Sequence, residues 1–296
     1  MSTSPTSGRY HEVPGGRVWC ELLNPDAPGT PVVTVHGGPG TPHDYLRPVA
    51  GLLPGHPVLV YDQLGCGRSD APSDDGLWEL PRFVDELEEV TRAQGLDRFH
   101  LLAHSFGTMI ACDLALRGSL RLESLVLLSP VLSVRRYERD VQELLMGLPP
   151  NVAGAITGAL RGGPDGPERA EAFLHFAERH MCRREPWPDE LVEASARTSV
   201  RVRDTMWGPT EFQISGNLRS YHRIEQLRDI DTPTLLMCGE YDFTSPKVCR
   251  AYARSLAHGR VAVIPNASHN AHLEEPEECA DHLGGFLDTV TESVQT

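Results

Sequence analysis

The chain has 296 residues, of which 40% are hydrophobic, and this length suits one large α/β domain with an insertion or two domains. Its formal net charge of −14 argues against nucleic acid or an anionic membrane surface as a partner. No apolar run approaches the ~20 residues of a membrane span, and residues 1–8 have no basic head or apolar core, so we expect neither a membrane segment nor a signal peptide. Seven scattered cysteines, an odd number, indicate reduced thiols and a cytoplasmic protein. No Cys/His cluster has zinc spacing, and we expect no metal and no cofactor.

Short apolar runs alternate with helix-compatible segments along most of the chain. The predicted strands are 9–13, 17–23, 31–36, 58–62, 101–104, 124–129, 234–238 and 260–264, and the predicted helices are 80–94, 109–117 and 273–290. Such alternation predicts a mostly parallel sheet with helices on both faces. In these sheets, ligands bind beyond the carboxyl ends of the strands.

The pattern changes between residues 131 and 230. This stretch has helical periodicity, is rich in Arg and Glu, and is interrupted by Pro149-Pro150 and by Pro186-Trp187-Pro188. We interpret it as a helical cap domain inserted into a core domain made of residues 1–130 and 231–296.

A strand, a tight turn and a helix meet at Ala103-His104-Ser105-Phe106-Gly107. This is the nucleophile elbow of the α/β-hydrolase fold, G-x-S-x-G, with Ala103 in place of the first glycine. The turn would place the Ser105 hydroxyl at the end of the sheet and at the N-terminus of the next helix. Taken alone, Ser105 could equally be an ordinary turn serine, so the prediction depends on the rest of the chain.

A serine needs a base within hydrogen-bonding distance to act as a nucleophile at neutral pH. We predict His269 as that base and Asp242 as the carboxylate that orients it, in the chain order Ser105, Asp242, His269 that is typical of this fold. His272 is an alternative base and Glu240 an alternative acid, and Asp242 could instead be a helix N-cap. The backbone N–H groups of Gly37 and Phe106 are the predicted oxyanion hole.

Several segments together resemble the proline iminopeptidase and serine aminopeptidase family of α/β hydrolases. They are His36-Gly-Gly-Pro-Gly40, Asp62-Gln-Leu-Gly-Cys-Gly-Arg-Ser69, Met206-Trp-Gly-Pro-Thr-Glu-Phe212, Gly239-Glu-Tyr-Asp242 and Ser268-His269. The resemblance covers nearly the whole chain, from about His36 to Glu277. It implies a cofactor-free serine hydrolase that releases a single N-terminal residue, often proline or another small or apolar one, through an acyl-enzyme.

Members of this family must recognise a free α-amine, and they do so with glutamates of the cap and of a loop near the nucleophile. The resemblance implies that Glu211 anchors the amine, although a solvated surface carboxylate is the plain alternative. Phe243 stands where related chains often carry a second glutamate, so the amine site is expected to lack one carboxylate or to use another residue such as Asp204. Gly38, Trp207, Phe212 and Phe243 are further predicted substrate contacts.

Two other functions remain open from the sequence. Phe243 favours an amidase, esterase or lactonase that acts on a small molecule without a free amine. A ligand-binding α/β hydrolase without turnover is the second alternative, and the complete Ser-Asp-His set argues against it. The sequence does not indicate the physiological substrate or the oligomeric state.

Overall fold

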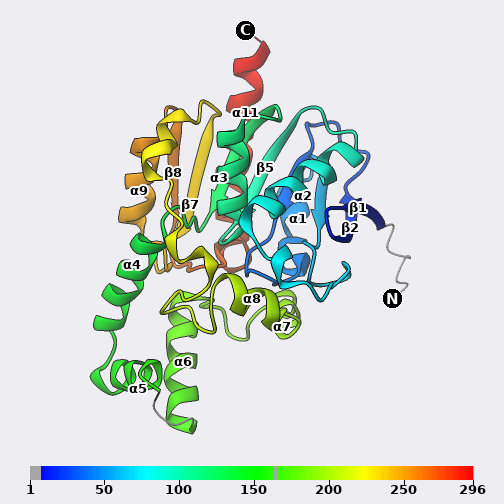
Figure 1. Cartoon of the computed structure of the whole chain (residues 1–296). Helices are drawn as coiled ribbons and strands as arrows, with labels where there is room; N and C mark the ends of the chain where they lie inside the picture. The colour runs from blue at the N-terminus through cyan, green and yellow to red at the C-terminus, as the bar shows by residue number, and fades with distance from the viewer. Residues whose placement is uncertain (1–7, 163–165, 296) are drawn as a thin grey trace.

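The computed structural model describes residues 8–162 and 166–295 and contains an eight-stranded sheet of order β1-β2-β4-β3-β5-β6-β7-β8 (Figure 1). The first two strands are antiparallel, and β3 to β8 run parallel. The strands are β1 Arg9–Val13, β2 Gly16–Leu23, β3 Val32–Val35, β4 Val58–Tyr61, β5 Phe99–His104, β6 Leu122–Leu128, β7 Thr234–Gly239 and β8 Gly259–Ile264. The α/β-hydrolase architecture predicted from the sequence is therefore confirmed. Residues 1–7, which include most of the segment without a signal-peptide pattern, lie outside the described residues.

The central strands are buried along their whole length, as their uninterrupted apolar sequences predict. Helices cover both faces of the sheet. The helices outside the insertion are α1 Val49–Leu52, α2 Leu80–Ala93, α3 Gly107–Arg117, α9 Pro246–Ser255, α10 Ala271–Glu274 and α11 Pro276–Gln295, with the 3₁₀ turns η1 His43–Leu46 and η2 Asp75–Leu77. Side chains of α2, α3 and α9 pack into one apolar cluster, and those of α1 and α11 pack into another.

Local sequence signals explain where these helices begin and end. Pro81 lies in the first turn of α2, where its missing N–H costs nothing, and Gly118 caps α3 with a left-handed φ of 65°. The sequence predicted one helix over 273–290, and this prediction is wrong at its start: Pro276 separates α10 from α11. Proline removes a helical hydrogen bond and disfavours helical geometry in the preceding residue, but it is favourable as the first residue of a new helix.

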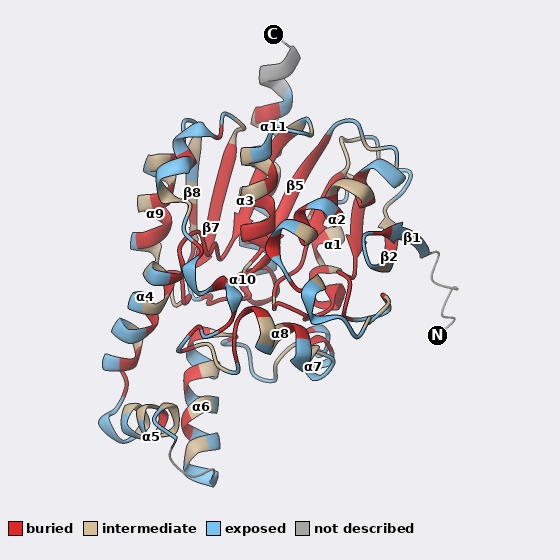
Figure 2. Cartoon of the chain, in the orientation of Figure 1, coloured by how far each residue is buried: buried red, intermediate tan, exposed pale blue. Residues whose placement is uncertain are grey.

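The segment between β6 and β7 lies beyond the carboxyl ends of the parallel strands (Figure 1). It contains α4 Val134–Met146, α5 Pro150–Leu160, α6 Pro167–His180, α7 Asp189–Ala196, α8 Val200–Met206, η3 Asn217–Ser220 and η4 Ile224–Asp229. The outer sides of these helices are exposed, whereas Val202, Met206 and Trp207 belong to the same buried cluster as Phe106 and Ile110 (Figure 2). The inserted helices therefore pack directly on the end of the sheet where the predicted site residues lie. No helix within the described residues is long and apolar enough to cross a membrane.

Candidate active site

Ser105 follows β5 directly and adopts a left-handed backbone conformation with a φ of 53°. A non-glycine residue held in this conformation costs about 1–3 kcal/mol, so the surrounding structure must enforce it. Gly107 is necessary because a Cβ atom there would lie 2.4 Å from the Val35 carbonyl oxygen. The Ser105 N–H donates to the Leu128 carbonyl oxygen of β6 at 3.0 Å, which fixes the turn against the sheet. Ala103, buried in β5, replaces the usual glycine without breaking the strand.

His269 and Asp242 come from the loops after β8 and β7, and they meet beside Ser105. The His269 Nδ1 atom lies 2.9 Å from Asp242 Oδ1, and both side chains are buried. Because a carboxylate only accepts, Nδ1 carries the proton and Nε2 is left as the basic nitrogen. Asp242 Oδ1 also accepts the Thr244 N–H at 3.1 Å, which orients the carboxylate.

The alternative assignments do not fit this geometry. His272 is buried and its Nε2 hydrogen-bonds to the Tyr45 carbonyl oxygen at 3.0 Å, away from Asp242. Glu240 is exposed and accepts the Asn266 N–H. The N-cap of α9 is Ser245, whose side chain accepts the Val248 N–H, so Asp242 is not the helix cap.

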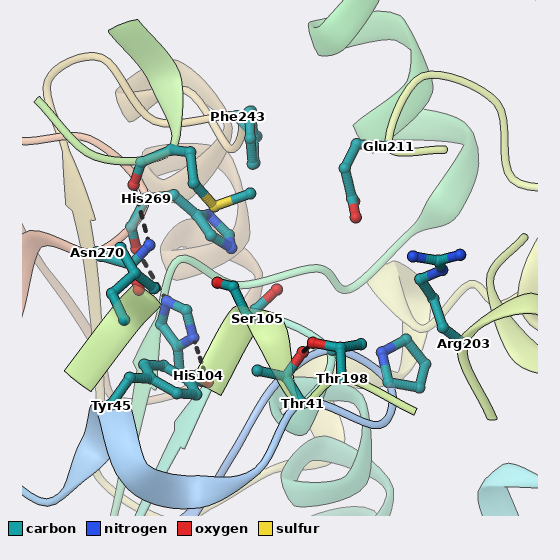
Figure 3. Close-up of a pocket in the computed structure, with 15 residues that line it drawn as sticks. Thr41, Tyr45, His104, Ser105, Thr198, Arg203, Glu211, Phe243, His269 and Asn270 are labelled. Carbon is teal, nitrogen blue, oxygen red and sulfur yellow. Dashed lines mark hydrogen bonds between the residues drawn. The ribbon is translucent and has the colours of Figure 1, made fainter. Parts of the chain in front are cut away.

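A cavity of about 250 Å³ opens over Ser105 (Figure 3). Its lining residues come from both the sheet end and the inserted helices: Gly38, Pro39, Thr41, Tyr45, His104, Ser105, Met181, Leu191, Ser195, Thr198, Arg203, Glu211, Phe243, His269 and Asn270. The cavity therefore places the predicted nucleophile, base, Gly38, Glu211 and Phe243 around one volume. Ser105 lies between His269 on one side and the wall that carries Glu211 and Arg203 on the other (Figure 3).

The two backbone N–H groups predicted as oxyanion donors lie in different surroundings. The Phe106 N–H has no acceptor among the described residues and lies at the N-terminus of α3, as expected. The Gly37 N–H, however, donates to the Tyr45 hydroxyl oxygen at 2.7 Å, and Gly37 does not line the cavity. Gly38 does line the cavity, and its N–H has no acceptor in the described part of the chain. The loop donor best placed for an oxyanion is thus Gly38 in place of Gly37.

Glu211 enters the cavity from the segment after α8. The Tyr137 hydroxyl donates to Glu211 Oε2 at 3.2 Å. Burial raises the pKa of Glu211, while the charge of His269 and the hydrogen bond from Tyr137 act in the opposite direction. A buried carboxylate of this kind gains most from a cationic partner. Asp204, the alternative amine ligand, is exposed and paired with Arg203 at 2.9 Å, so it does not face the cavity.

The aromatic residues predicted to contact substrate fall into two layers. Phe243 lines the cavity, with its ring centroid 4.7 Å from that of His269. Trp207 and Phe212 do not line this cavity, and their contact with substrate stays a prediction. Trp207 packs on Tyr137 at 5.2 Å, and Phe212 packs on Phe176 at 4.7 Å. Aromatic spacing in the sequence cannot distinguish a wall from the layer that supports it.

Two buried clusters beside the site contain metal-ligating residue types, His36 with Asp62 and Cys66, and His43 with Asp44 and Asp62. Most of their potential ligand atoms already have hydrogen-bond partners, although His43 Nε2 has none among the described residues. The Gln63 N–H donates to His36 Nε2 at 2.9 Å, and Asp62 accepts from His43 and from the Arg68 N–H. Burial alone would raise the pKa of Asp62, but the hydrogen bonds and charge of its neighbours outweigh it and lower the pKa to about 2. These hydrogen bonds fasten the 62–69 loop to the 36–40 loop.

Comparison with known proteins agrees with this geometry. The family model described as alpha/beta hydrolase fold matches residues 30–276. A proline iminopeptidase of Heyndrickxia coagulans is 36% identical over 283 residues, which cover 95% of this chain and 98% of that protein. A proline iminopeptidase of Saccharolobus solfataricus is 32% identical over 285 residues, which cover 95% and 92% of the two chains. The crystal structure of a proline iminopeptidase of Mycobacterium smegmatis superposes with a TM-score of 0.90 at 31% identity, over 97% of this chain and all of that one.

The chain belongs to the proline iminopeptidase family of α/β hydrolases. It is a serine hydrolase of the aminopeptidase type, as the resemblance implied. The sequence analysis missed two residues that line the cavity close to Ser105. Tyr45 lies in the segment that follows the glycine loop, and His104 lies inside the elbow motif itself. Their positions within these two motifs were the sequence signal that could have identified them.

Proposed function

We propose that Ser105, His269 and Asp242 are the catalytic triad and that the enzyme releases an N-terminal residue, proline or another small or apolar one, from peptides or amino-acid amides. The observation that carries this proposal is one small cavity shared by Ser105, His269 and the partly buried side chain of Glu211. The volume of about 250 Å³ suits a single residue and a short leaving group. The relatives named proline iminopeptidase support the same substrate class.

The His269–Asp242 hydrogen bond supports the following reaction sequence. His269 Nε2 takes the Ser105 hydroxyl proton while Ser105 Oγ attacks the scissile carbonyl carbon. The N–H groups of Phe106 and Gly38 hold the resulting oxyanion, and each such donor is typically worth about 2.7–4 kcal/mol of barrier lowering. His269 then donates the proton to the leaving amine, and the C–N bond breaks to give an acyl-enzyme. A water molecule activated by His269 attacks the acyl carbon and releases the free amino acid and Ser105.

Glu211 is the amine anchor in this proposal. Its carboxylate would accept N–H hydrogen bonds from the substrate ammonium, a charge-assisted contact worth about 1.5–3 kcal/mol. Phe243 provides only an apolar face beside it, so the second carboxylate of related chains has no equivalent there. Residues 131–230 would act as a cap domain that closes the cavity and selects the acyl residue, with residues 1–130 and 231–296 as the catalytic domain. The seven cysteines are all free and buried, which suits the cytoplasmic location we propose.

The test is hydrolysis of prolyl and alanyl arylamides, each with a free and an N-acetylated amine, by the wild type. The proposal predicts that the free-amine forms are preferred by tenfold or more in kcat/KM. Equal turnover of the N-acetylated forms, or better turnover of simple esters, would support the amidase or esterase alternative and exclude amine recognition. Absence of turnover together with failure of a fluorophosphonate probe to label Ser105 would support a ligand-binding protein instead.

A further inference from the structure

The imidazole of His104 joins two parts of the active site that are distant in sequence. His104 immediately precedes Ser105 and is 3% exposed. Its Nδ1 atom lies 2.9 Å from the Tyr45 hydroxyl oxygen, and its Nε2 atom lies 2.8 Å from the carbonyl oxygen of His269 (Figure 3). Both ring nitrogens are therefore used inside the protein, although the side chain also borders the cavity.

The chemistry of the partners fixes every proton in this chain of bonds. A carbonyl oxygen can only accept, so His104 Nε2 carries the ring proton and Nδ1 is an acceptor. The Tyr45 hydroxyl must then donate to Nδ1, and its oxygen accepts the Gly37 N–H at 2.7 Å. Burial, together with the charges of His269 and His272, lowers the pKa of His104 well below its ordinary value, so the ring stays neutral. The bonds run in one direction, from Gly37 through Tyr45 and His104 to His269.

The two ends of this series of hydrogen bonds are both tied to the surroundings of Ser105. At one end, a Cβ atom on Gly37 would lie 2.9 Å from the Ser105 Cβ, so the 37–38 loop rests directly on the nucleophile. At the other end, the carbonyl oxygen of His269 also accepts the Ser129 hydroxyl at 2.8 Å, which anchors it to the end of β6. Movement of the imidazole would therefore shift the loop and the histidine backbone relative to Ser105.

We propose that Tyr45 and His104 are positioning residues that hold the 37–38 loop and the backbone of His269 in fixed relation to Ser105. By occupying the Gly37 N–H, Tyr45 also leaves Gly38 as the loop donor that faces the cavity. This proposal rests on the proposed roles of Ser105 and His269. The two residues contact the 37–38 loop and the backbone of His269 but not the reacting atoms, so their loss should lower kcat more than it raises KM.

Three near-isosteric variants separate the bonds. Tyr45→Phe removes only the hydroxyl group. His104→Gln keeps an N–H donor near the place of Nε2 and loses the acceptor for Tyr45, whereas His104→Asn keeps an acceptor near Nδ1 and loses the donor to His269. Misplacement of reacting groups by about 1 Å can cost about 100-fold in rate, so we expect each variant to lose about 10- to 100-fold in kcat with KM within about threefold. His272→Gln is the matched control, since its amide N–H can still donate to the Tyr45 carbonyl oxygen, and it should keep wild-type kcat.

A double-mutant cycle tests whether the residues act as a unit. Tyr45→Phe and His104→Gln break the same hydrogen bond, so the double variant should lose little more in kcat than the worse single variant. Thermal unfolding and circular dichroism establish that each variant is folded. If a His104 variant does not fold, the kcat of Tyr45→Phe still tests the proposal. The proposal is overturned if folded variants keep kcat within threefold of the wild type, or if the two effects multiply in full. If Ser105→Ala is as active as the wild type, the proposed function fails instead, and the two failures are thereby distinguishable.

Discussion

The floor and the far wall of the cavity are built differently. The floor consists of loops after β3, β5, β7 and β8, where side-chain and backbone polar groups are linked by buried hydrogen bonds of 2.7–2.9 Å such as Gly37–Tyr45, Tyr45–His104 and Asp242–His269. The wall comes from the inserted segment, where Glu211 accepts the Tyr137 hydroxyl at 3.2 Å and Tyr137 packs edge-to-face on Trp207. The floor fixes geometry for bond making and breaking, whereas the wall presents the charged side chains of Glu211 and Arg203 to the cavity. The contrast suggests that chemistry and substrate choice can be changed separately.

The largest effect should come from the floor. Ser105→Ala removes the proposed nucleophile, and we expect kcat to fall about 10⁵- to 10⁶-fold, with the residual rate due to the oxyanion hole and substrate binding. The measurement is arylamide hydrolysis with rigorous exclusion of contaminating peptidase. Retention of more than a hundredth of the wild-type rate would show that another group attacks the substrate.

Asp242→Asn should have the next largest effect. An asparagine amide can donate to His269 Nδ1 and so favour the wrong tautomer, which leaves Nε2 unable to act as a base. We expect kcat to fall about 10⁴-fold with little change in thermal stability. Glu240→Gln, on an exposed neighbour, is the matched control and should leave kcat unchanged. A similar loss in both variants would mean that the acid has been assigned to the wrong residue.

Because several histidines are buried in the floor, we expect the free energy of unfolding to fall at acidic pH. Burial lowers the pKa values of His36 and His272 to about 4, and that of His104 well below 6.5. The unfolded chain therefore binds more protons between about pH 6.5 and pH 4, so the free energy of unfolding falls over that window and not above it. At about 1.4 kcal/mol for each pKa unit, His36 and His272 each contribute about 3 kcal/mol of this loss, and His104 adds to it in the same direction.

Denaturant unfolding measured from pH 7.5 to pH 4 tests this prediction. His272→Gln, which cannot be protonated in this range, should reduce this loss of stability by about 3 kcal/mol. A stability that stays constant down to pH 4.5 would contradict the burial of neutral histidines in the floor.

The smallest predicted effect belongs to the wall. Tyr137→Phe removes the hydroxyl that donates to Glu211 while keeping the ring that packs on Trp207 and Phe243. We expect kcat/KM for free-amine substrates to fall about tenfold, consistent with one hydrogen bond to a charged group. The rate for N-acetylated substrates is the internal control and should be unchanged. An equal loss for both substrate types would place Tyr137 in the chemistry and not in amine recognition.

The positions of the floor residues could be predicted from the sequence more fully than those of the wall residues, because short local motifs specify the floor. The strand–turn–helix at Ser105 and the strand ends before Asp242 and His269 are fixed by short-range rules, and parallel strands bring their carboxyl ends together. The break at Pro276 could have been read from the sequence as well, since proline punctuates helices in a known way.

What the sequence could not specify concerns long-range contacts. Whether the Gly37 N–H faces the cavity depends on Tyr45, eight residues further on, whose hydroxyl takes that donor. Whether Trp207 and Phe212 face the substrate depends on how the inserted helices pack on Tyr137 and Phe176, and periodicity does not specify which side of an aromatic cluster is open. The sequence alone also does not show that the Asp204 carboxylate pairs with Arg203.

The most direct test of the separation between floor and wall is the effect of Glu211→Gln on matched prolyl arylamides with a free and an N-acetylated amine. Glutamine keeps the size of the side chain and removes its charge. The account predicts that kcat/KM for the free-amine substrate falls about 10- to 100-fold, to the level of the N-acetylated substrate, whose own rate changes less than threefold. Equal losses for both substrates, or no loss for either, would contradict it, because Glu211 would then support the chemistry or take no part in recognising the amine.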